Sequence, residues 1–205
     1  ELNPGYLTAH QWYGWLLTHL ARHDEAIEYL RGAKALDPLS LIARLDLAAA
    51  YYHARRFEEA LDESEACFEA QICAGMGRVY SRSLVALGRA EEALTAEANR
   101  GGRTREEVLA LAALGREEEA RRGFERYVAE LEATGGWTER PVIHLYLAEM
   151  HVALGEHEAA LDAVERAEEL GLATGPVLIR EWPAFDPVRG HPRYLTVLER
   201  MGYPD

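Results

Sequence analysis

The chain has 205 residues, of which 48% are hydrophobic and 28% charged, a composition typical of a folded protein with a substantial core. Its 22 basic and 35 acidic residues give a formal net charge of −13, which opposes contact with nucleic-acid phosphate, and no local basic patch counters it. The sequence has neither the roughly 18-residue apolar run of a membrane span nor the pattern of a signal peptide. We therefore expect a soluble, cytoplasmic protein without nucleic-acid or membrane contacts.

One pattern recurs along the chain: a charged turn, then acidic residues, then an alanine. The alanines that mark its five copies are Ala26, Ala60, Ala93, Ala120 and Ala160. Their spacings of 34, 33, 27 and 40 residues scatter around a period of about 34. A period of this length is the mark of a solenoid built from repeated helical units.

Apolar periodicity predicts two helices in the first unit, residues 7–40. The first carries Trp12, Tyr13, Leu16, Leu17 and Leu20, the second carries Ala26, Ile27, Leu30 and Ala33, and Asp37-Pro38 ends it. We expect the same helix hairpin in residues 41–73, 74–100, 101–135 and 136–175, with glycine-containing loops near residues 100–104 and 134–137. Pro4 stands one period before Pro38, so residues 1–6 are interpreted as the tail of a preceding repeat, and the chain as a fragment.

Residues 176–205 are expected to cap the array, because a last repeat would otherwise leave its apolar face in water. Asp186 is predicted to be a helix N-cap with Pro187 at the first helical position. His191 and Pro192 repeat this arrangement for a final helix that carries Tyr194, Leu195 and Leu198 and stops at Gly202.

The acidic clusters, such as Glu58-Glu59, fall in the first turn of the second helix of each unit, where the helix dipole favours carboxylates. They need no metal and no acid or base chemistry. Glu149 and His151 form the one pair that suggests catalysis or metal binding, but they lack the HExxH spacing and a third ligand. We expect no catalytic residues, no metal and no cofactor.

The repeat resembles the tetratricopeptide repeat (TPR). The residues that carry the resemblance are Tyr13, Gly14, Leu17, Ala26, Ala33 and Pro38 in the first unit and Leu47, Ala48, Tyr51, Ala60 and Cys67 in the second. The resemblance implies an all-α fold, a right-handed superhelical solenoid of about five helix hairpins with a C-terminal capping helix.

In TPR proteins the first helices of successive units line a concave groove that binds peptides or helices of partner proteins. Carried over to this sequence, the groove positions are Gln11, Trp15, Asp46, Tyr52, Arg78, Arg82, Tyr146 and Glu149. Arg78 and Arg82 lie one helical turn apart, and they either pair with neighbouring acids or hold an acidic partner segment. One TPR subfamily grips acidic chaperone tails with lysines, asparagines and an arginine, but the corresponding positions here include Gln11, Trp15 and Asp46.

The C-terminal segment FDPVRGHPRY (185–194) resembles the tail of TPR modules in multidomain bacterial regulators, in which the repeats follow a winged-helix, adenylate cyclase or serine/threonine kinase domain. Residues 35–61 are similar to the same modules. Two positions depart from that tail, which commonly has an acid in place of His191 and phenylalanine in place of Tyr194.

Together these features predict a non-catalytic module that binds a protein or peptide partner, as the interaction or sensory part of a bacterial regulatory protein in signalling or transcription regulation. A structural alternative is self-association of the array into a homo-oligomer. An enzyme is the least favoured of the three classes.

Overall fold

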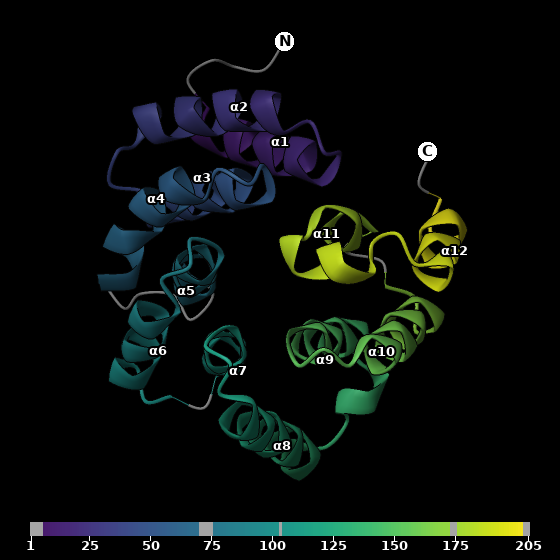
Figure 1. Cartoon of the computed structure of the whole chain (residues 1–205). Helices are drawn as coiled ribbons and strands as arrows, with labels where there is room; N and C mark the ends of the chain where they lie inside the picture. The colour runs from purple at the N-terminus through teal and green to yellow at the C-terminus, as the bar shows by residue number, and fades with distance from the viewer. Residues whose placement is uncertain (1–5, 70–75, 103, 173–175, 203–205) are drawn as a thin grey trace. The chain divides into compact units, whose positions relative to one another are not determined.

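The computed structural model describes residues 6–69, 76–102, 104–172 and 176–202 (Figure 1), and all regular structure within these ranges is helical. The predicted repeat tail at residues 1–6 lies, except for Tyr6, outside them. The chain divides into two compact units, Glu1–Glu92 and Ala93–Asp205. Among the described helices, none combines the length and the apolar character needed to cross a membrane.

The first unit consists of successive helix hairpins. Its helices are α1 (Leu7–His19), α2 (His23–Leu36), α3 (Leu41–His53), α4 (Phe57–Glu69) and α5 (Met76–Ala86), followed by the start of α6 (Ala90–Asn99). α1 packs against α2 and α3, and α3 packs against α4 and α5. Ser40 begins α3 by accepting a hydrogen bond from the Ala43 N–H at 3.3 Å.

The crossing of α1 and α2 depends on a residue without a side chain. A Cβ atom added to Gly14 would lie 2.5 Å from Leu30 Cγ, well inside van der Waals contact. Gly14 therefore lets the fully buried Leu30 pack directly against the α1 backbone. This is the role that the TPR resemblance implies for a small residue at the helix crossing.

The repeat identified in the sequence is also a repeat in backbone geometry. Five residues before each marker alanine, the turn of the hairpin has a positive φ: 55° at Ala21, 61° at Arg55, 75° at Gly88, 70° at Gly115 and 74° at Gly155. Left-handed backbone reverses the chain between the two helices of a hairpin. The marker alanines are all fully buried, as a close helix crossing requires.

An ion pair accompanies the turn in the first four hairpins. The arginine just after the left-handed residue donates to the glutamate three residues later, at 2.7 Å for Arg22–Glu25, 2.8 Å for Arg56–Glu59, 2.7 Å for Arg89–Glu92 and 2.7 Å for Arg116–Glu119. The acidic clusters thus combine the favourable helix-dipole position with a local partner. In the fifth hairpin Glu156 takes the arginine's place and accepts from Arg121 at 2.5 Å and His151 at 2.7 Å.

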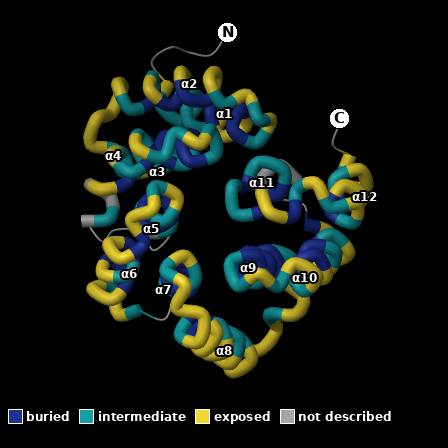
Figure 2. Tube along the Cα trace, in the orientation of Figure 1, coloured by how far each residue is buried: buried dark blue, intermediate teal, exposed yellow. Residues whose placement is uncertain are grey.

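The second unit contains two further hairpins. α7 (Arg105–Ala113) pairs with α8 (Glu117–Thr134), and the short 3-10 helix η1 (Trp137–Glu139) leads into α9 (Pro141–Ala153), which pairs with α10 (His157–Glu169). α7 also contacts α9. The buried core between these helices consists of Val108, Leu109, Leu111, Ala120, Ile143, Leu147 and Met150. Buried stretches face neighbouring helices, while much of α8 is exposed (Figure 2).

The C-terminal segment consists of α11 (Pro176–Glu181), the 3-10 helix η2 (Pro183–Val188) and α12 (Pro192–Arg200). It packs on α9 and α10 through η2, and on α10 through α12. The prediction that Asp186 is an N-cap is wrong. Trp182 and Pro183 already begin the helical turn, so Asp186 lies inside η2 and accepts from Arg189 at 2.8 Å. The predicted start at His191 is confirmed, since its Nδ1 accepts the Arg193 N–H at 3.3 Å with Pro192 in the first turn.

The inner face of α12 closes this end of the unit. Tyr194 and Val197 are buried, whereas Leu195, expected on the same helix, is exposed. The Tyr194 hydroxyl donates to the Ile179 carbonyl at 2.5 Å, and its ring lies 6.0 Å from that of Phe185. Arg193 binds the outer side of α10, donating to Asp162 at 2.6 Å and to Glu165 at 2.7 Å.

Candidate functional site

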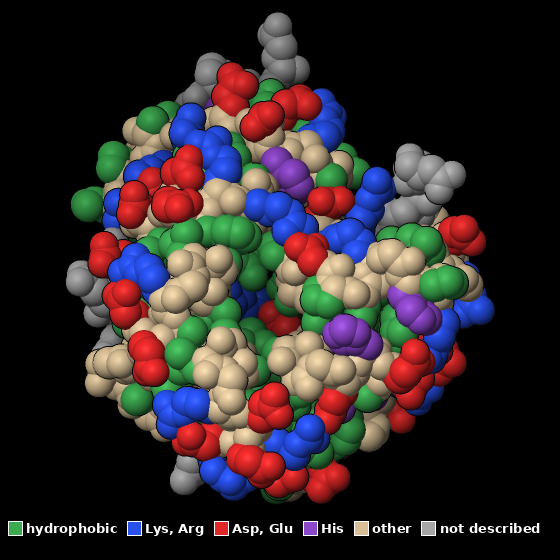
Figure 3. All heavy atoms as spheres, in the orientation of Figure 1, with side chains coloured by type: hydrophobic (Ala, Val, Ile, Leu, Met, Phe, Trp, Pro, Cys, Tyr) green, Lys and Arg blue, Asp and Glu red, His purple; other side chains and the backbone are tan. Residues whose placement is uncertain are grey.

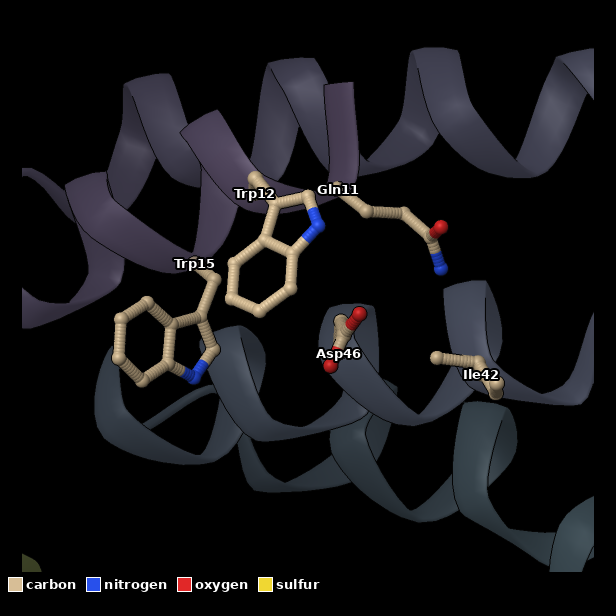
Figure 4. A pocket seen from close by; sticks show the side chains of 5 residues that line it. All are labelled: Gln11, Trp12, Trp15, Ile42 and Asp46. Atoms are coloured by element: carbon tan, nitrogen blue, oxygen red, sulfur yellow. The ribbon is translucent and has the colours of Figure 1, made fainter. Parts of the chain in front are cut away.

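A hollow of about 340 Å³ lies between α1 and α3 in the first unit, and Gln11, Trp12, Trp15, Ile42 and Asp46 line it (Figure 4). The indole rings of Trp12 and Trp15 extend from α1 toward α3, and the Asp46 carboxylate extends from α3 into the space between the helices (Figure 4). Three of the predicted groove residues, Gln11, Trp15 and Asp46, are thus brought together.

Helical spacing explains why these side chains converge. Gln11 and Trp15 are four residues apart on α1, and Ile42 and Asp46 are four apart on α3, so each pair shares one face of its helix. The residues of α1 that are buried are Gly14, Leu17 and Thr18, and none of them lines the hollow. The hollow is consequently bounded by side chains that the hairpin core does not use.

The apolar side chains of this hollow are unusually exposed. Trp12 is 67% exposed, Trp15 43% and Ile42 61%. The indole rings of Trp12 and Trp15 meet at 76° with their centroids 6.1 Å apart, so they form two walls of a corner. Aromatic side chains at such positions are typical anchors of protein interfaces.

A histidine packs against one of the two indole rings. The His19 ring lies 3.8 Å from the Trp15 ring, and its Nδ1–H donates to the Trp15 carbonyl at 2.8 Å. Burial lowers the pKa of His19, and the hydrogen bond to the Trp15 carbonyl only partly opposes this effect. A neutral imidazole therefore stacks on Trp15 near neutral pH.

Asp46 is the acid of the hollow. Burial raises the pKa of Asp46 from 3.8 to about 6, with desolvation as the cause. Neither an ion pair nor a hydrogen bond from another described residue offsets this desolvation. Ionisation of the Asp46 carboxyl therefore costs free energy in the folded protein. The carboxyl also lines a space that is open to a ligand.

This cost predicts a pH-dependent effect of Asp46→Asn. An acid whose pKa is higher in the folded than in the unfolded state stabilises the protein at low pH and loses that contribution as pH rises through the folded pKa. Between about pH 4 and about pH 8, the wild type should lose about 1–2 kcal/mol of unfolding free energy relative to Asp46→Asn, a value reduced for the partial exposure of the group. Urea denaturation at both pH values measures this difference.

Asp62→Asn is the matched control, because it removes the same charge from an exposed position on α4. Its difference from the wild type at the two pH values is the reference for the loss of one surface charge. A difference for Asp46→Asn that changes with pH no more than that of Asp62→Asn would show that the Asp46 carboxyl is not desolvated in the folded protein.

The other groove positions predicted in the first unit lie outside the hollow. Tyr52, at the end of α3, is buried and packs its ring 5.5 Å from Phe57. On α5, Arg82 is buried and Arg78 is half-buried. Burial leaves Tyr52 and Arg82 little surface to offer a partner.

In the second unit, Tyr146 and Glu149 belong to a buried polar cluster centred on Arg105. Arg105 Nη1 donates to Glu149 Oε2 at 3.3 Å and Nη2 to Glu106 Oε1 at 3.5 Å, while the guanidinium carbon lies 3.5 Å from the Tyr146 ring centroid. Arg105 is only 5% exposed and Glu149 only 1%. This geometry makes Glu149 part of an internal ion pair rather than of an exposed surface.

Glu149 and His151, considered as a catalytic or metal pair, have separate partners. His151 Nδ1 lies 2.7 Å from Glu156 Oε2, whereas Glu149 binds Arg105. Across the part of the chain that the structure describes, no three His, Cys, Asp or Glu side chains gather as metal ligands would.

Sequence reasoning missed Trp12 and Ile42 as lining residues of the hollow. Trp12 is one of the apolar positions that mark the first helix, yet it points away from the hairpin core. The available signal is the excess of apolar residues in HQWYGWLLTHL, more than one buried face of a helix can hold.

Comparisons with known proteins agree with this architecture. No protein-family model matches the sequence, and no curated protein gives a significant match. Among solved structures, the thermophilic TPR protein TTC0263 of Thermus thermophilus is 22% identical and superposes with a TM-score of 0.61, covering 88% of this chain and 99% of that one. YrrB, a TPR protein with an unusual peptide-binding site, is 18% identical with a TM-score of 0.50, covering 84% of this chain and 90% of that one. The fold is an all-α solenoid of TPR-like helix hairpins.

Proposed function

We propose that this chain is a non-catalytic interaction module that binds a segment of a partner protein, with the hollow between α1 and α3 as the centre of the binding site. The observation that carries this proposal is the corner formed by Trp12 and Trp15, which is exposed although indole rings are favourably buried. YrrB, which has the same fold, is named for a peptide-binding site, so peptide binding is compatible with this architecture.

The resemblance of residues 185–194 and 35–61 to modules of bacterial regulators supports a finer assignment. In this assignment the module is the interaction or sensory part of a cytoplasmic bacterial regulator acting in signalling or transcription. On the face drawn in Figure 3, acidic and basic side chains are interspersed instead of gathering by sign. That distribution favours a protein partner over a nucleic acid.

Selection from a library of displayed random peptides tests the interaction module. Peptides enriched on the wild-type chain should bind Trp15→Ala at least about tenfold more weakly, as is typical for loss of an aromatic anchor. Leu195→Ala, which removes an exposed leucine from α12 in the second unit, is the control and should bind like the wild type. Thermal melting of each variant checks that it is folded.

The proposal is wrong if no peptide is enriched, or if the enriched peptides bind Trp15→Ala as tightly as the wild type. Sedimentation velocity separates it from the self-association alternative. A wild-type dimer that Trp15→Ala converts to a monomer would assign the exposed corner to a second copy of the chain.

A further inference from the structure

The hollow between α1 and α3 has a definite chemical character. Its walls are the faces of Trp12 and Trp15 and the aliphatic side chain of Ile42, its polar rim includes the Gln11 amide, and Asp46 is its single ionisable lining residue. The site therefore combines aromatic faces with one carboxylate.

Both of these features attract the same kind of group. The face of an indole ring carries a negative quadrupole potential that attracts a cation, most strongly where water is excluded. A partly buried carboxylate is stabilised by an opposite charge within hydrogen-bonding distance. A cation in the corner would interact with Asp46 and the indole faces together.

The apolar walls suit the remainder of a basic side chain. Lysine and arginine carry long aliphatic stems that pack along apolar surface while the charged head reaches a polar group. Here the exposed surfaces of Trp12, Trp15 and Ile42 would cover the stem, and Asp46 would receive the head. A hollow of about 340 Å³ is larger than a small inorganic ion needs and has room for an extended side chain.

Other occupants fit less well. An acidic segment would meet the Asp46 carboxylate and a chain whose formal net charge is −13. A purely apolar helix would cover Asp46 without supplying a partner for its charge, which costs free energy. A basic segment meets neither penalty.

We propose that this hollow binds a lysine or arginine side chain of a basic partner segment, with its stem along the corner formed by Trp12 and Trp15 and its charged group on Asp46. The inference rests on the proposed interaction function and specifies the chemistry of the partner. It assigns Trp12 and Ile42 to the binding surface and gives Asp46 the role of specificity determinant.

The probes for this proposal are fluorescein-labelled peptide mixtures that differ only in a fixed central residue, either lysine, arginine, norleucine or glutamate, with the other positions randomised over small and apolar residues. Norleucine retains the straight stem of lysine without the charge. The lysine and arginine mixtures should bind the full chain about tenfold more tightly than the norleucine mixture. They should also shift the indole Nε1–H signals of Trp12 and Trp15 in NMR spectra.

Asp46→Asn should abolish most of the preference for lysine over norleucine while leaving norleucine binding nearly unchanged. Asp62→Asn, with the same loss of charge on α4, should keep the full preference, which separates a local ion pair from the effect of net charge. Trp12→Ala should weaken binding of both basic mixtures about tenfold.

The outcomes distinguish the two proposals. If norleucine or glutamate mixtures bind as tightly as lysine mixtures and shift the same indole signals, the site binds peptides but the basic-partner proposal is wrong. If Asp62→Asn removes the preference as fully as Asp46→Asn, the preference comes from net charge and the assignment to Asp46 is wrong. If no mixture shifts the indole signals, the proposed interaction function fails as well.

Discussion

Replacing Tyr194 by alanine should lower the free energy of unfolding by about 3–5 kcal/mol, the range found when a large buried ring is removed from a core. Tyr194 is fully buried, and its ring packs 6.0 Å from Phe185. The substitution also leaves the Ile179 carbonyl without the hydroxyl that donates to it at 2.5 Å. Urea denaturation monitored by circular dichroism measures the loss.

Two variants of the same helix make this result specific. Tyr194→Phe removes only the hydroxyl and should cost about 0.5–1.5 kcal/mol. Leu195→Ala removes an exposed side chain next to it and should stay within about 0.5 kcal/mol of the wild type. If Tyr194→Ala unfolded like Leu195→Ala, α12 would not be packed on the second unit as the structure shows.

Substitution of Tyr194 in the C-terminal segment should leave peptide binding unchanged. Because the hollow belongs to α1 and α3, the folded fraction of Tyr194→Ala should bind selected peptides as the wild type does. Loss of binding at an unchanged melting temperature would instead place FDPVRGHPRY in a binding site.

Replacing Arg105 by alanine should destabilise the protein by about 3–5 kcal/mol, because it removes a buried cation that pairs with two buried acids. Arg105 is the cation between Glu106 and Glu149, and it also covers the Tyr146 ring. Water cannot readily replace the guanidinium, since Glu149 is only 1% exposed. Urea denaturation at neutral pH measures the loss.

A double substitution separates charge from packing. Arg105→Met with Glu149→Met removes both members of the ion pair while retaining apolar bulk, and it should recover most of the stability lost in Arg105→Met alone. Denaturation of the wild type, the two single variants and the double variant forms a complete cycle. A double variant as unstable as the sum of the single variants would show that the two side chains are not energetically coupled.

The fold could be predicted from the sequence because its signals are local and repeated. Each marker alanine, the turn five residues before it and the acidic first turn beside it lie within one short stretch, and the structure buries all five alanines fully. His191-Pro192 is a similarly local signal. The prediction of Asp186 as an N-cap was wrong because Trp182 and Pro183 begin the helical turn earlier in the chain. A capping rule applied to one residue does not compare it with other possible caps nearby.

The candidate site was predictable only in part, for a geometric reason. Spacing along α1 and α3 brought Gln11, Trp15 and Asp46 to one side, but the repeat pattern does not say which apolar residues of a helix remain outside the core. Arg105 and Glu149 are 44 residues apart, so no local pattern indicates that the two charges meet. Helical periodicity places residues on a face, whereas pairing between distant helices depends on the tertiary packing.

The turn ion pairs bear on how readily the repeats can be exchanged. In each of the first four hairpins, the arginine and the glutamate of the turn belong to the same hairpin. Duplication or deletion of a whole hairpin therefore leaves neither of these two charges without the other. The fifth hairpin differs, because Glu156 at its turn pairs with Arg121 of α8 as well as with His151 of its own hairpin. Deletion of the hairpin that contains α8 would therefore remove one of the two partners of Glu156, so the last hairpin is matched in part to its neighbour.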